Sequence, residues 1–155
     1  MIKIDQASIK KLLPKVCDWL EQQENAIISQ GRLLTSDEQS IAREIGVKNY
    51  DIVRVWMSKE VPFPNDALLL QLAKQIGLLN SNTQGICFRY GIFVHEQAAN
   101  PKEVLAHELI HTLQYERFGS IEAFIAQYLS ECIEVGYHQS NLEKEANLGL
   151  HKLNL

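Results

Sequence analysis

Two histidines and a glutamate lie within five residues of one another in the stretch LAHELIHTLQ, which runs from Leu105 to Gln114. On a helix, His107 and His111 project from one face a turn apart, because successive residues advance by about 100°. Glu108 then lies beside that face, and three leucines form an apolar back for the core. Two neutral imidazoles supply two zinc ligands, and the glutamate between them can reach a water at the metal. The spacing therefore indicates a zinc hydrolase.

A catalytic zinc ion normally has a third protein ligand as well as a water. A third histidine six residues after His111 does not occur, because that position is Arg117. Two glutamates further along, Glu143 and Glu145, offer a carboxylate instead. On a helix these two side chains point about 200° apart, so only one of them can face the metal.

The two halves of this ligand set resemble the HExxH…ExxA[D/N] pattern of gluzincin-type zinc metallopeptidases. The first half is HELIH, and the second is EKEAN, from Glu143 to Asn147. The segments YGIFV, LAHELIHTLQYERFG, FIAQYLSE and GYHQSNLEKEA are also similar to small, largely uncharacterised bacterial proteins assigned as HExxH metallopeptidases. The closer resemblance covers residues 85–150. The match to the second half of the pattern favours Glu143 over Glu145 as the third ligand.

The resemblance implies a role for each residue of the pattern. His107, His111 and Glu143 are the expected zinc ligands, and Glu108 is the expected catalytic acid and base. Such proteins usually carry an aspartate where this chain has Asn147. The amide oxygen of an asparagine can still accept a hydrogen bond from a ligating histidine.

A site of this kind hydrolyses peptide bonds with a zinc-activated water. Glu108 would take a proton from the water and deliver it to the leaving amine. Tyr137 and His138 are candidate donors to the oxyanion, because they fall near the turn before the Glu143 helix. A packed tyrosine and an exposed histidine are the alternatives at these two positions.

Three further features have both a functional and a structural interpretation. The segment YGIFVHE, Tyr90–Glu96, can pair with an extended substrate if it is an edge strand, or it can be an ordinary core strand. His95, near its end, fits a surface histidine. Gln114 lies one turn beyond His111 and can either orient that ligand or be a helix residue without a special role.

The motif lies in the best-marked helix of the chain. Asn100 is a favourable N-cap, Pro101 suits the first helical position, and Gly119 stops the helix. Other signals predict a helix that ends at Gly31, one from the cap Ser36 to Gly46, and one from Asp66 to Ile76. They also predict a helix that ends at Gly136 and a last helix with Asn141 as its cap. DIVRVWMS predicts a strand, and GICFRYGIFVHE predicts a hairpin or one bent strand, with Gly91 permitting the bend. We expect an α+β fold: a mostly helical zincin-like domain with a small β-sheet and HExxH on a central helix.

Length and composition limit the classes of function. The 155 residues contain no repeat or long linker, so we expect one domain, 1–155, with a support region of helices and a strand at 1–84 and a zincin-like metal-binding core at 85–155. The net charge of −4 disfavours a nucleic-acid partner. No apolar run suits a signal peptide or a membrane span, which predicts a cytoplasmic protein without a membrane partner. Three widely spaced cysteines predict buried thiols.

The expected partner is a peptide or protein substrate, and the small size suggests a shallow cleft or one that a partner protein completes. Three other classes remain open. The first is a zinc-binding structural or interaction protein without catalysis, although zinc binding alone does not require Glu108. The second is a helix-turn-helix regulator built on residues 36–56, whose second helix would have to form from β-branched sequence. The third is a helical protein without a metal.

Overall fold

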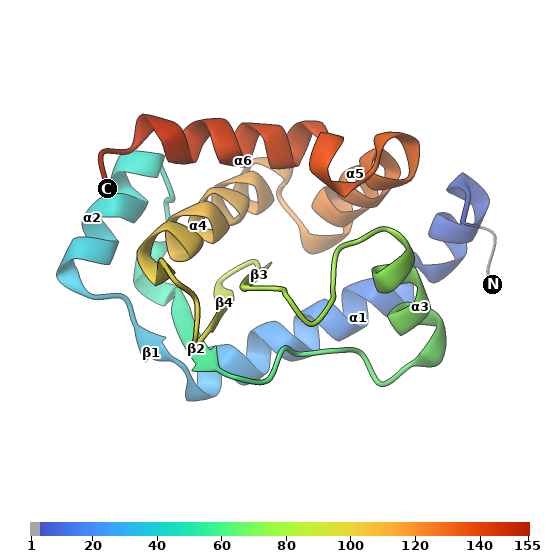
Figure 1. Cartoon of the computed structure of the whole chain (residues 1–155), viewed down its shortest axis with the longest axis horizontal. Helices are drawn as coiled ribbons and strands as arrows, with labels where there is room; N and C mark the ends of the chain where they lie inside the picture. Colours follow the sequence, from blue (N-terminus) through green and yellow to red (C-terminus); the bar gives the residue numbers. More distant parts are fainter. Residues whose placement is uncertain (1–3) are drawn as a thin grey trace.

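The computed structural model describes residues 4–155 and confirms an α+β fold, mostly helical with a small mixed sheet (Figure 1). In chain order the elements are α1 (Gln6–Gln30), β1 (Arg32–Leu33), α2 (Ser36–Ile45), the 3-10 helix η1 (Tyr50–Ile52), β2 (Arg54–Ser58), α3 (Ala67–Gln75), β3 (Gly85–Phe88), β4 (Gly91–His95), α4 (Pro101–Phe118), α5 (Ile121–Val135), the 3-10 helix η2 (Tyr137–Gln139) and α6 (Asn141–Lys152). None of the helices in this part of the chain is long and apolar enough to cross a membrane.

The strands lie in the order β1-β2-β4-β3. β2 is parallel to β4, and the other neighbours are antiparallel. β4 therefore has a partner on each side, so of the two alternatives for Tyr90–Glu96 the core strand is confirmed and the edge strand is wrong. The free edge next to α4 belongs to β3. A local pattern cannot reveal this, because the parallel pairing of β2 with β4 joins segments that are far apart in sequence.

β3 and β4 form the predicted hairpin, but its bend differs from the prediction. The residue with a positive φ is Arg89, at 67°, rather than Gly91. Gly91 is needed for close packing instead. A β-carbon there would lie 3.0 Å from Ile27 Cβ and 3.2 Å from the backbone of Glu24.

The motif helix α4 has a central position. It packs against β3 and β4, which α1 also contacts, and α6 lies along α4 on the side away from α1 (Figure 1). Leu109 and Ala106 on α4 are fully buried. Its ends are those predicted: Asn100 caps the first turn, and Gly119 closes the last with a φ of 87°. The prediction of HExxH on a central helix is therefore confirmed.

Two caps differ from the predicted ones by one residue. Thr35 rather than Ser36 caps α2, in a capping box with Glu38. Ser140 rather than Asn141 caps α6. The helix-turn-helix interpretation is wrong in this region, because the chain after Gly46 forms η1 and strand β2 instead of a recognition helix.

Candidate metal centre

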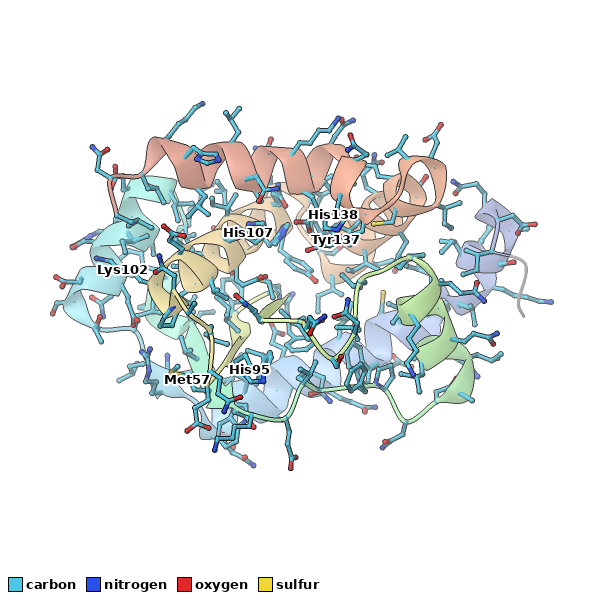
Figure 2. All side chains as sticks on the ribbon, in the orientation of Figure 1. Met57, His95, Lys102, His107, Tyr137 and His138 are labelled. Carbon is cyan, nitrogen blue, oxygen red and sulfur yellow. The ribbon has the colours of Figure 1, made fainter. Side chains whose placement is uncertain are left out.

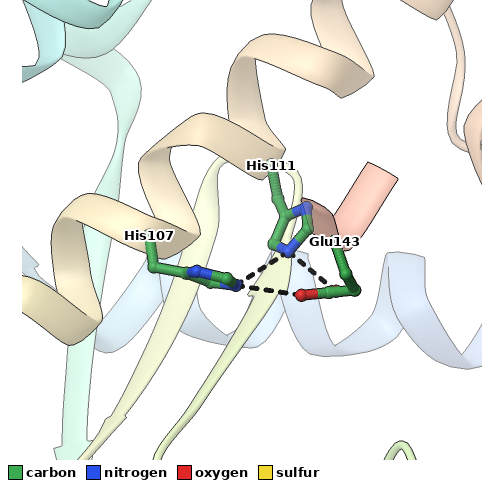
Figure 3. A group of neighbouring side chains, drawn as sticks. All are labelled: His107, His111 and Glu143. Carbon is green, nitrogen blue, oxygen red and sulfur yellow. Dashed lines mark hydrogen bonds and ion pairs between the residues drawn. The ribbon is translucent and has the colours of Figure 1, made fainter. Parts of the chain in front are cut away.

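His107 and His111 from α4 meet Glu143 from α6 in one compact cluster (Figure 3). His107 Nε2 lies 3.1 Å from Glu143 Oε1, and His111 Nε2 lies 3.0 Å from Glu143 Oε2. The two Nε2 atoms are 3.2 Å apart. One ligand atom from each side chain lies within 4.8 Å of the others, so the cluster can hold a metal ion.

Two of the three side chains, His111 and Glu143, are buried, and they form an ionisable pair. Burial alone would lower the pKa of His111, but its hydrogen bond to Glu143 and the charge of that carboxylate raise it to about 9. Burial opposes ionisation of Glu143, yet hydrogen bonds with His107 and His111 hold its pKa well below the usual range. Without a metal, a proton on His111 therefore balances the carboxylate. A metal ion would displace that proton, as binding to imidazole normally does.

Tyr128 on α5 also contacts the Glu143 carboxylate, at the oxygen that faces His111. Its hydroxyl donates to Glu143 Oε2 at 2.6 Å, in a buried position. Burial and the nearby carboxylate raise the pKa of Tyr128 well above its usual value, so the phenol remains a donor. Sequence reasoning missed Tyr128, because a tyrosine at helical spacing in α5 looks like any other core residue.

The second candidate glutamate has a different position. The Glu145 carboxylate pairs with Arg117 and accepts a hydrogen bond from Gln114 Nε2 at 2.8 Å. Gln114 Oε1 in turn lies 2.7 Å from His111 Nδ1. Asn147 is exposed and lies outside the cluster, so the expected second contact to a histidine comes from Gln114 instead. Of the two glutamates, only Glu143 joins the histidines.

Glu108 lies between α4 and the edge strand β3. A β-carbon on Gly85 would fall 2.9 Å from Glu108 Oε1 and 2.6 Å from Val104 Cγ1, so a larger residue there would have to displace these two side chains. Burial raises the pKa of Glu108, and the charges of His107 and His111 offset part of that shift. Sequence reasoning also missed Gly85, because a glycine at the start of a predicted strand does not reveal which side chains pack against it.

A cavity of about 510 Å³ opens beside the cluster. Glu108, the three clustered side chains and the β3 segment from Gly85 to Cys87 all line it, together with apolar side chains from α1 and α5. Tyr137 and His138, on η2, line it too, and Figure 2 shows both near His107. Burial and the charges of Glu143 and Glu108 raise the pKa of Tyr137, so its phenol is a neutral donor.

β3 is held against α4 by two side chains that follow the motif. Thr112 Oγ1 donates to the Arg89 carbonyl at 2.7 Å, and the Tyr115 hydroxyl donates to the Cys87 carbonyl at 3.4 Å. The His95 N–H donates to the Gln84 carbonyl at 2.7 Å, which marks Gln84 and His95 as a hydrogen-bonded pair. In an antiparallel ladder the pairs alternate, so the N–H and C=O of the next residue, Gly85, point away from β4.

The remaining predicted residues lie outside the cluster. His95 Nδ1 accepts a hydrogen bond from the Gln97 N–H at 3.0 Å, at the end of β4.

Cys87 and Cys132 are buried, whereas Cys17 is half-buried, so the expectation of three buried thiols holds for two of them. Burial raises the pKa of Cys17 to about 11 and that of Cys132 to about 12, which keeps both as thiols.

Comparisons of the chain with protein-family models, with curated proteins and with solved structures found no match.

Proposed function

We propose that this protein is a zinc-dependent metallopeptidase of the gluzincin type. The observation that carries the proposal is the buried cluster of His107, His111 and Glu143, with Glu108 beside it on the wall of the same cavity. A buried carboxylate that faces two imidazoles forms a ready site for a divalent cation. The neighbouring carboxylate then gives this site a group that can transfer protons.

The donor set fits zinc better than the hard cations. Two imidazole nitrogens and one carboxylate oxygen are a common catalytic zinc set, whereas calcium and magnesium prefer sites made of oxygen ligands. His107, His111 and Glu143 would hold the ion. When bound, zinc lowers the pKa of a water and polarises the carbonyl of the substrate.

Glu108 supplies the proton transfer. Its burial raises its pKa from the usual value, which brings a carboxylate closer to the range useful for a general base. In this role it accepts a proton from the attacking water and delivers it to the leaving amine. Zinc binding alone does not require Glu108. Its place beside the cavity therefore supports an enzyme rather than a zinc-binding structural protein.

The cavity also suits a peptide. The backbone N–H and C=O of Gly85 face away from β4, and Gly85 lines the cavity, so an extended chain can add to the β3 edge there. The Tyr137 hydroxyl, kept protonated by its burial, is a donor for the oxyanion that develops on the substrate.

The experiment is Glu108→Gln, assayed with a mixed library of fluorogenic peptides and by metal analysis. We expect zinc to be retained and hydrolysis to fall by about 100-fold or more, the size typical of a lost general base. Glu103→Gln is the matched control, because Glu103 lies at the cavity on the same helix but is exposed. This control should keep both zinc and activity.

Two results would contradict the proposal. Zinc-loaded wild-type protein that cleaves no peptide of the library would indicate a zinc-binding protein without catalysis. Equal hydrolysis by Glu108→Gln and wild type would remove Glu108 from the mechanism.

A further inference from the structure

The side-chain amide of Gln114 is fully buried between α4 and α6, and its orientation is determined by its partners. Gln114 Nε2 donates to the Leu142 carbonyl at 3.0 Å and to Glu145 Oε1 at 2.8 Å. Both partners are oxygens that only accept, so the nitrogen of the amide must face them. The oxygen of the amide must then face His111.

This orientation selects the tautomer of His111. Gln114 Oε1 lies 2.7 Å from His111 Nδ1 and can only accept, so Nδ1 must carry the proton. In the neutral ring the lone pair is then on Nε2, the atom that faces His107 and Glu143. A metal binds imidazole through such a lone pair. The amide therefore presents the correct nitrogen to the cluster.

The same amide also locates the third ligand. Leu142, whose carbonyl accepts from Gln114, directly precedes Glu143 in α6. Glu145, three residues after Leu142 in the same helix, is held by Arg117 of α4 as well as by Gln114. One side chain thus contacts both the second histidine and the helix segment that carries the carboxylate.

We propose that Gln114 is the positioning residue of the metal centre: it fixes His111 as the Nδ1–H tautomer and sets the place of Glu143 through the Leu142 carbonyl, with Glu145 supporting the amide. The inference rests on the metal-binding part of the function proposed above. It assigns to Glu145 a supporting role behind the site rather than a place among the ligands.

The test compares the zinc affinity of folded, full-length variants, measured by competition with a chromogenic chelator. Gln114→Met keeps a similar volume but removes every hydrogen bond of the amide. We expect its zinc affinity to fall by about 10- to 100-fold, the usual effect of losing an outer partner of a ligand. Lys144→Gln is the matched control, since Lys144 is an exposed residue of the same helix, α6. Its affinity should change by less than about fivefold, because the lost charge is largely exposed.

A second variant separates tautomer selection from packing. In the double variant Gln114→Glu with Glu145→Gln, a carboxylate accepts the His111 Nδ1–H and the new amide donates to that carboxylate, while the Leu142 carbonyl loses its donor. We expect zinc affinity within about tenfold of the wild type, together with a lower unfolding stability of the metal-free protein. A role in packing alone would lower stability without this recovery of affinity.

The outcomes are distinguishable. Wild-type affinity in folded Gln114→Met, or a double variant more than about 100-fold weaker than wild type, would overturn the role of Gln114 and leave the metal centre standing. If Gln114→Met does not fold, the double variant decides alone. A wild-type protein that binds no zinc would overturn this inference and the proposed function together.

Discussion

Two buried glutamates, Glu24 on α1 and Glu143 on α6, differ in the partners that surround them. Glu24 is 2% exposed, and both of its oxygens lie 2.7 Å from guanidinium nitrogens of Arg89. The Tyr90 N–H adds a third donor at 3.0 Å. Glu143 is 3% exposed but faces two histidines and the hydroxyl of Tyr128.

The difference lies in the permanence of the positive charge. An arginine is always protonated, so Glu24 has a fixed counter-charge and completes a structural contact between α1 and the β3–β4 turn. A histidine carries its proton only conditionally, so the counter-charge of Glu143 can be replaced. A metal cation can take the place of the proton on a histidine beside Glu143, whereas nothing comparable can replace the fixed charge of Arg89 beside Glu24.

The largest expected effect is on metal binding at Glu143. Glu143→Gln keeps the shape but removes the charged ligand, so zinc affinity should fall by more than about 100-fold, beyond the loss typical of outer partners. Competition with a chromogenic chelator measures it, and Glu145→Gln is the control that should remain close to wild type. If Glu145→Gln lost zinc and Glu143→Gln did not, the metal ligand would be Glu145 rather than Glu143.

The next effect concerns the fold. Glu24→Gln leaves Arg89 without its counter-charge, and we expect the metal-free protein to lose about 3 kcal/mol of unfolding free energy, at the low end for a broken buried pair because Arg89 is one third exposed. Urea denaturation measures this loss. The exposed Glu21 on the same helix provides the control, Glu21→Gln, which should change stability by less than about 0.5 kcal/mol. A weaker zinc affinity in folded Glu24→Gln would show that the two carboxylates are not independent.

The smallest expected effect is at Tyr128. Tyr128→Phe removes the hydroxyl that holds Glu143 and should weaken zinc affinity by about tenfold, within the range for outer partners of a metal site. Isothermal titration with zinc in the presence of a competing chelator measures it. Unchanged affinity would mean that the two histidines and the contact between Gln114 and the Leu142 carbonyl are enough to orient Glu143.

The parts of the molecule that were predictable from sequence are those that local rules determine. The α4 helix follows from Asn100, Pro101 and Gly119, and the meeting of His107 with His111 follows from helical spacing. Glu143 was indicated by its resemblance to a known pattern, and the structure places it beside them.

The parts that were not predictable depend on contacts between distant segments. Arg89 reaches Glu24 across 65 residues, and the inner place of β4 depends on its parallel pairing with β2. Gly85 is needed because of where β3 crosses α4 rather than because of its own turn. Tyr128 donates to Glu143 from a separate helix. In each case the residue type is compatible with many environments, and only tertiary packing selects one.

Elemental mass spectrometry of the wild-type protein, purified without chelators and without a polyhistidine tag, measures directly whether the protein holds zinc. We expect about one zinc ion per chain, as for a site with three protein ligands, and its loss in Glu143→Gln. A wild-type protein without zinc, even after reconstitution with the metal, would contradict this expectation and would reduce the cluster to a buried ion pair.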